Sequence, residues 1–507
     1  MDAKEQLKED VRTGKVSTDY LIDLIFSLQN QLQAALQEIA DLKKQIASSP
    51  TPKVAEPYSI KAEEKRQEAK NPKKKRKQKN GKKRGRITSA EKIAQAERSE
   101  AIYPEGLDKN ACHLSHTRPV WRVENGRAVL IAYQIYRGPK NRYGQIPGVI
   151  GRSEFGIEIF VEIAFLVYTV GMSFDKVCLS LQFFQNMTLR KAQVDALLHR
   201  LSRHWEKEFD TLCTLVANSL VVWTDETGWS LNSVWAFLSE KARILLFGVN
   251  KDADTLAKIL DPSTFKGLVV SDDAAVYGHF THSQKCWAHL LRKAIKLTLL
   301  EPDNAEYRRF TDRLIEIYRK AVRVKRDGRL GEAGRLQKIA ELEDEIVVLC
   351  RPLWSQNLPK LAGTQDDYRK LNNEIMTLVM REELFAFVTT EEVEQPNGVT
   401  VEVGATNNES ERTLRKPAEA RKTGRTSKSL FGARRQSILT SVLESLRLYL
   451  KQFTLANVIE EINSWTEEGI SCFTKLLNKM NLSLPKISVL NGLFPKVEAE
   501  PKLKPSG

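Results

Sequence analysis

The chain has 507 residues, 41% of them hydrophobic, and a formal net charge of +15. This length predicts two to four domains with packed cores. Six cysteines are scattered without a CxxC pair, which argues against a disulfide scaffold and favours a reducing compartment. The first residues lack the apolar core of a signal peptide, and the longest apolar run, 157–172, is too short to cross a bilayer and contains Glu158 and Glu162. We therefore expect a cytoplasmic protein with no membrane partner.

Residues 1–50 are predicted to form a coiled coil. The positions Leu21, Ile25, Leu28, Leu32, Ala35, Ile39, Leu42 and Ile46 alternate spacings of four and three. This heptad predicts self-association through residues 21–46, as a homodimer or a higher oligomer. The alternative is a helix that packs against its own chain.

Residues 51–104 read as a disordered basic linker, because they are poor in apolar residues and rich in Lys, Glu, Pro and Ser. Ten Lys or Arg and no acid lie between Lys73 and Arg86. The run Lys73, Lys74, Lys75, Arg76 and Lys77 suits a polyanion, and we expect it to hold DNA phosphates without sequence preference. The alternative is a nuclear localisation signal, which the run from Pro72 to Lys77 also resembles.

Residues 105–218 are predicted to be a helical region that binds DNA. Helices are expected at 154–170, 174–184 and 189–209, and the last two resemble a helix-turn-helix. Arg190, Lys191, Arg200 and Arg203 on the last helix are the candidate contacts to DNA. Earlier in this region Cys112, His113 and His116 offer three zinc ligands, but a structural zinc site normally takes four.

Residues 219–300 change to an α/β pattern. Strands are expected at 220–224, 234–239, 244–249 and 268–271, with a helix at 253–260 before the last strand. This is the order of an RNase H-like core, in which the first and fourth strands are neighbours. The fold class is therefore α/β, with the core interrupted by a helical insertion at 301–400. The last helix of the core and further helices follow at 401–480, then a tail at 481–507.

Three acids stand out in this arrangement. Asp225 and Asp272 each close an apolar run, and Glu411 lies at the start of the helix that follows Asn407 and Asn408, a pair that we expect to cap it. Two strand-end acids and a third on a later helix suit two Mg²⁺ ions, which Mn²⁺ can replace, that clamp the oxygens of a phosphodiester. Glu226 and Asp273 are expected on opposite strand faces. Spacing alone leaves Glu409 open as an alternative to Glu411.

Four motifs in this order resemble the insertion sequence 66 family of bacterial DDE transposases. They are Thr224-Asp225-Glu226-Thr227-Gly228-Trp229, Val270-Ser271-Asp272 with Tyr277 downstream, Cys286-Trp287-Ala288-His289, and Asn407-Asn408-Glu409-Ser410-Glu411-Arg412. The resemblance runs from about residue 105 to 460. It selects Glu411, because the family motif has its acid directly before an arginine.

The resemblance implies a magnesium-dependent enzyme that cuts double-stranded DNA at the ends of a mobile element and joins them to target DNA. It implies a bacterial, nucleoid-associated protein, with helper proteins encoded by the same element. Arg412 and Arg415, beside Glu411, are further candidate DNA contacts. The chain departs from the family in lacking a full cysteine-rich zinc segment. The alternatives are an RNase H-like nuclease without strand transfer and a catalytically inactive, domesticated DNA-binding protein.

Overall fold

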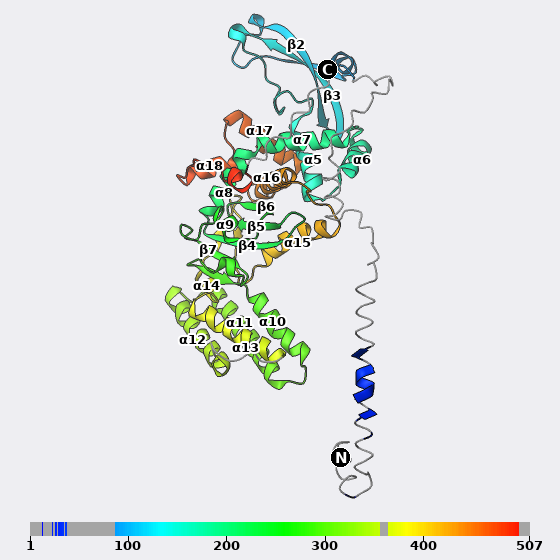
Figure 1. The fold of residues 1–507 in the computed structure, drawn as a ribbon. Coiled ribbons are helices and arrows are strands. Elements are labelled where there is room, and N and C mark those ends of the chain that lie inside the picture. Colours follow the sequence, from blue (N-terminus) through cyan, green and yellow to red (C-terminus); the bar gives the residue numbers. More distant parts are fainter. Residues whose placement is uncertain are drawn as a thin grey trace. The chain divides into compact units, whose positions relative to one another are not determined.

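The structure is a computed structural model that describes residues 87–354 and 363–495, together with residue 13 and positions 23, 26–27, 29–34 and 36–37. The chain divides into two compact units, residues 1–83 and 84–507. Figure 1 traces both units in sequence colours. In the first unit, the described positions from 23 to 37 are helical and exposed, among them Leu32. The other core positions of the predicted heptad and the basic run 73–77 lie outside the described residues, so the coiled coil remains a prediction.

The second unit begins with a helix and a three-stranded sheet rather than with a linker and helices. The elements are α4 (Ser89–Ala94), β1 (Arg98–Ile102), β2 (His113–Glu124) and β3 (Arg127–Arg137), in the sheet order β1-β3-β2. The predicted linker was therefore wrong over residues 87–104, and the predicted helical region was wrong over its first part, up to Arg137. Asn125 and Gly126 both have positive φ angles in the β2–β3 turn, the Asn-Gly pair that is the strongest local signal for a hairpin.

A run of helices follows this sheet. They are α5 (Ile157–Ala164), the π-helical segment η3 (Phe165–Thr169), α6 (Phe174–Gln185), α7 (Lys191–His204) and α8 (Glu206–Ala217). The predicted helix 189–209 is two helices, because the fully buried Trp205 leaves helical geometry at φ −100° and ψ 12°. Between α6 and α7 the chain turns at Asn186, which has a φ of 55°. Asparagine tolerates this left-handed conformation better than most residues.

The central sheet has five strands in the order β6-β5-β4-β7-β8. Their bounds are β4 (Val221–Gly228), β5 (Ser233–Ser239), β6 (Arg243–Val249), β7 (Leu268–Ser271) and β8 (Ser283–Lys285), and the short helix α9 (Ala253–Ala257) precedes β7. The β4–β5 and β5–β6 pairs are antiparallel, whereas β4–β7 and β7–β8 are parallel. The predicted adjacency of the first and fourth strands is confirmed.

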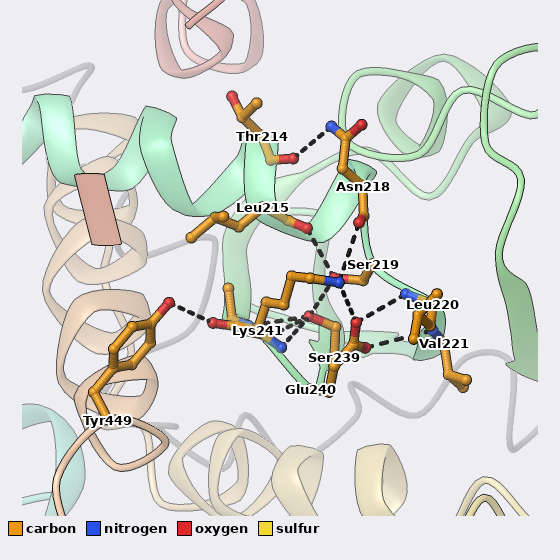
Figure 2. Close-up of polar contacts among 11 residues, drawn as sticks. Thr214, Leu215, Asn218, Ser219, Leu220, Val221, Ser239, Glu240, Lys241 and Tyr449 are labelled. Atoms are coloured by element: carbon orange, nitrogen blue, oxygen red, sulfur yellow. Dashed lines mark hydrogen bonds and ion pairs between the residues drawn. The ribbon is translucent and has the colours of Figure 1, made fainter. Parts of the chain in front are cut away.

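The start of β4 is fixed by a group of buried polar contacts (Figure 2). Ser219 donates to the Leu215 carbonyl at 2.8 Å and to the Ser239 hydroxyl at 2.9 Å. The buried carboxylate of Glu240, in the β5–β6 turn, accepts the backbone N–H groups of Leu220 and Val221 at 2.8 and 3.4 Å. These bonds satisfy donors that would otherwise be buried without a hydrogen-bond partner. They also set where β4 begins.

A helix with three buried serines covers the outer side of β6. In α16 (Leu430–Leu446), Ser437, Ser441 and Ser445 accept the N–H groups of Phe247, Leu245 and Arg243, each at 2.9 Å. Serines four residues apart on a helix advance about 6 Å, close to the ~6.8 Å between alternate strand residues. Gly248, with a φ of 75°, permits the close packing of α16 on β6, since a Cβ there would lie 2.8 Å from the Cβ of Ala433.

The predicted insertion is a helical bundle with its own apolar core. It contains α10 (Trp287–Leu300), α11 (Ala305–Arg326), α12 (Glu332–Cys350), α13 (Thr364–Met380) and α14 (Ala386–Thr389) (Figure 1). The core is lined by one face of each long helix, including Leu314, Ile346 and Ile375. The two-residue strands β9 (Val393–Glu394) and β10 (Thr400–Val401) lead back to the sheet.

The helix that carries the third acid, α15 (Asn408–Lys422), continues through Pro417. Pro417 is buried, so tertiary packing outweighs the single backbone hydrogen bond that proline removes. After α16 come α17 (Leu455–Glu468), α18 (Cys472–Lys479) and α19 (Val489–Leu493). The predicted tail from residue 481 was wrong over its first part, because Leu490 and Phe494 are buried in the main core. No helix of the described residues is long and apolar enough to cross a membrane.

Candidate active site

Asp225 lies in β4, and Asp272 directly follows β7, the strand that pairs with β4 in parallel. The β4–β7 register pairs Val221 with Leu268 and Trp223 with Val270. Continued two residues further, the same register brings Asp225 level with Asp272. Asp225 lies inside β4 rather than just beyond its end, because β4 extends to Gly228 through its pairing with β5.

Negative charge gathers around Asp225. Burial, together with the nearby carboxylates of Glu226, Asp272 and Glu411, raises the pKa of Asp225 to about 7, against the lowering effect of a backbone hydrogen bond from Glu226. Both Asp272 and Glu411 thus act on Asp225 electrostatically. A group of neighbouring carboxylates in a partly buried position is a feature of functional sites.

Glu411 and Glu409, which spacing could not separate, face different partners. The Glu411 carboxylate accepts a hydrogen bond from Arg292 of α10 at 2.7 Å and lies 3.5 Å from the His289 ring. Glu409 instead pairs with Arg243 of β6 at 3.2 Å. Of the two, Glu411 is the one among the charges that raise the pKa of Asp225.

The acids that directly follow Asp225 and Asp272 are each held by other groups. Glu226 is buried, accepts a hydrogen bond from Tyr277 and forms an ion pair with Lys251 at 2.6 Å. Asp273 pairs with Lys293 at 2.5 Å. Each of these two acids thus has a lysine partner from another element, Lys251 or Lys293.

The donor set of the three acids fits a hard divalent cation. Carboxylate oxygens are the ligands that Mg²⁺ prefers, and adjacent negative charges favour its binding. Within the described residues, one group of three potential ligands lies within 4.8 Å of one another: Cys286, His289 and Glu411. Arg292, at 3.3 Å from His289 and 2.7 Å from Glu411, already supplies positive charge to this second group. Cys112, His113 and His116 do not form such a group.

The tryptophans of two of the motifs, Trp229 and Trp287, are in the core. Trp287 is fully buried and donates to the Leu384 carbonyl at 2.7 Å. Trp229 is 7% exposed and packs edge-on against Phe247. Neither ring is placed to stack on a nucleic acid.

The basic residues predicted to touch DNA are exposed where they are described. Arg190, Lys191, Arg200 and Arg203 lie at the start of α7 or along its outer face, and Arg412 and Arg415 lie on α15. Lys191 forms an ion pair with Asp175 of α6 at 3.1 Å. The remaining predicted contacts, Lys73 to Lys77, are outside the described residues.

Several groups around the acids were missed from the sequence. Neither Arg292 nor Lys251 was predicted from the sequence to lie near the acids. Lys285 is buried in β8, where its ammonium group donates to the Ser271 hydroxyl at 3.1 Å, and burial lowers its pKa. A lysine inside a three-residue strand next to the Asp272 strand is a clue in hindsight, since lysine is rarely buried without a partner.

This site lies in a mixed α/β fold whose sheet carries two of the acids. Residues 152–435 match the sequence profile of the Transposase IS66 family, and this span exceeds half of the chain. The protein belongs to the IS66 family of transposases, which are DNA-processing enzymes. No curated protein matches the chain.

Proposed function

We propose that this transposase cuts the ends of a mobile DNA element and joins them to target DNA, using Asp225, Asp272 and Glu411 as its catalytic acids. The observation that carries the proposal is the parallel β4–β7 register, which when extended aligns Asp225 with Asp272 just after β7, with Glu411 close enough to act on Asp225. The strand order and the acid-bearing helix after the sheet support an RNase H-like core.

The three carboxylates would hold two Mg²⁺ ions, with Mn²⁺ as a substitute. When bound, such ions activate a water or DNA 3′-hydroxyl and stabilise the leaving oxygen of a phosphodiester. The three carboxylates would orient the bound ions, and their negative charge would set the affinity of the site for Mg²⁺. Arg292, which is more than half exposed beside Glu411, is available to a DNA phosphate.

DNA binding is assigned to exposed basic residues on two helices and to the N-terminal basic run. The α6–α7 pair has the short connection of a helix-turn-helix, and Arg190, Lys191, Arg200 and Arg203 on α7 would contact the element end. Arg412 and Arg415 would contact phosphates near the acids, and Lys73 to Lys77 would hold DNA through charge. Residues 21–46 would pair two copies, which brings two element ends together.

The deciding experiment separates transfer from cutting. The full-length protein is incubated with Mg²⁺, a supercoiled target plasmid and DNA carrying the inverted repeats that flank the gene, either uncut or with a preformed 3′-hydroxyl end. The proposal expects cleavage of the first substrate and covalent joining of the second to the plasmid. Cleavage without joining would identify a nuclease instead. Specific binding without either reaction, in Mg²⁺ or Mn²⁺, would identify an inactive DNA-binding protein.

A further inference from the structure

Asn407 precedes the acid-bearing helix α15, but its side chain does not cap that helix. Asn407 is fully buried. Its amide nitrogen donates to the Thr224 carbonyl at 2.8 Å, across 183 residues of sequence, and its amide oxygen accepts from the Ser410 hydroxyl. The expectation that this asparagine serves as a simple cap was therefore wrong, because its donor group reaches the central sheet.

These contacts connect the backbones that carry two of the acids. Thr224 directly precedes Asp225 in β4, and the Asn407 main-chain carbonyl accepts the N–H of Glu411 at 3.2 Å. Two hydrogen bonds through one buried residue thus join the Asp225 strand to the backbone of Glu411. A one-turn shift or a tilt of α15 would break the first of them.

A third hydrogen bond connects Asn407 to the start of α10. The Asn407 N–H donates to the Cys286 sulfur at 3.2 Å. Cys286 is the N-cap of α10, the helix whose His289 and Arg292 face the Glu411 carboxylate. Asn407 is therefore bonded to β4 and to the start of α10, and its own helix carries Glu411.

We propose that Asn407 is a positioning residue, which holds Glu411 at the distance from Asp225 that a shared pair of divalent ions requires. The inference rests on the proposed function of these acids. Sites of this kind must be held within about 0.5 Å of the productive geometry, and hydrogen bonds from outside the ligand set commonly supply that precision. Asn407 is too deeply buried to touch DNA itself.

The test compares Asn407→Asp and Asn407→Ala with Asn408→Asp and Asn408→Ala, since Asn408 is the next residue on the same helix and is exposed. Ser410→Ala is a milder variant that removes the hydroxyl donor shared by the Asn407 amide oxygen and the Asn407 main-chain carbonyl. Mn²⁺ binding by full-length protein is measured by calorimetry or electron paramagnetic resonance. The Mg²⁺ concentration for half-maximal cleavage and the thermal midpoint without metal are measured in parallel.

We expect the Asn407 variants to bind Mn²⁺ about 10-fold or more weakly and to need correspondingly more Mg²⁺. Ser410→Ala should show a smaller shift, whereas the Asn408 variants should match the parent protein. Unchanged Mn²⁺ affinity in folded Asn407 and Ser410 variants would overturn the inference. So would a lowered thermal midpoint with no change in metal affinity. If the parent protein itself neither binds Mn²⁺ nor cleaves, the proposed function fails, which is a separate result.

Discussion

Glu411 accepts a hydrogen bond from Arg292 at 2.7 Å, whereas Glu409, on the same first turn of α15, is bonded to Arg243 at the start of β6. The two acids are about 200° apart around the helix. Glu411 therefore faces the bundle helix α10, whereas Glu409 faces Arg243 of the edge strand β6. This difference in partners favours Glu411 as the third acid, a choice that residue spacing left open. It also supplies a pair of matched variants.

We expect Asp225→Asn, Asp272→Asn and Glu411→Gln each to reduce Mg²⁺-dependent cleavage by at least about 1,000-fold while leaving the binding of element ends within a few-fold. Groups that act as a unit lose most of their effect when one is removed. The matched controls are Glu409→Gln and Asp273→Asn, which should retain cleavage. Loss of activity in Glu409→Gln with activity in Glu411→Gln would show that the opposite face of α15 holds the metal.

Asp225→Asn should stabilise the fold at pH 8 in the presence of a chelator, on the order of 1–3 kcal/mol. The pKa of Asp225 is raised to about 7, so the folded state binds an extra proton between about pH 4 and pH 7 and loses stability as pH rises through that window. The gain from the variant should therefore shrink toward pH 4. Denaturant unfolding at several pH values measures it.

Asp273→Asn gives the opposite sign in the same measurement. Burial opposes ionisation of Asp273, but hydrogen bonds to Lys293 and Glu374 hold its pKa below the usual range. Its charged form thus favours folding above about pH 4, and this variant should be less stable than the parent at pH 8. Equal stability of all three proteins at pH 8 would contradict the charge arrangement described for the site.

Deletion of residues 73–86 should weaken binding to all DNA sequences by a similar factor. Each phosphate contact that is lost should lower the slope of log affinity against log salt by about one. Filter binding or fluorescence anisotropy across a salt series provides the measurement, and scrambling the order of residues 73–86 is the control. A changed sequence preference with an unchanged slope would show that this segment recognises bases.

Leu32→Lys should shift the full-length protein to a smaller species in light scattering and abolish complexes that contain two element ends. A charge at a central heptad position opposes helix pairing. Binding to a single end should persist through α6 and α7. Gln31→Lys, at an exposed neighbouring position, controls for the added charge. An unchanged mass for Leu32→Lys would assign pairing to another part of the chain.

Ser441→Ala should lower the free energy of unfolding by about 1–3 kcal/mol, because the buried Leu245 N–H loses its partner. Ser464→Ala is the control, since that hydroxyl donates only to the Glu461 carbonyl of its own helix at 2.8 Å. It should change stability by less than about 0.5 kcal/mol. Similar effects from both substitutions would show that the bond between the Ser441 hydroxyl and β6 adds no stability of its own.

The sequence predicts the central sheet well because its strands are short apolar runs bounded by turns, and β7 begins and ends where expected. The first sheet was missed because residues 105–218 were assigned as a whole to a helical region, although Asn125-Gly126 marks the hairpin between β2 and β3. The break at Trp205 depends on packing that periodicity does not encode. Asp225 and Asp272 follow from strand order, but the role of Asn407 depends on a carbonyl 183 residues away.

The serines of α16 have a consequence for how copies of the protein can assemble. An edge strand normally offers alternate N–H and C=O groups to any passing strand. On β6 the N–H groups of Arg243, Leu245 and Phe247 are already bonded, and Ser445 and Ser441 return hydroxyl bonds to the carbonyls of Arg243 and Leu245. At the opposite margin, the Lys285 N–H is bonded to the Glu383 carbonyl at 2.8 Å. These positions of the sheet are thereby closed to β-augmentation, so another strand could pair there only after these hydrogen bonds were broken.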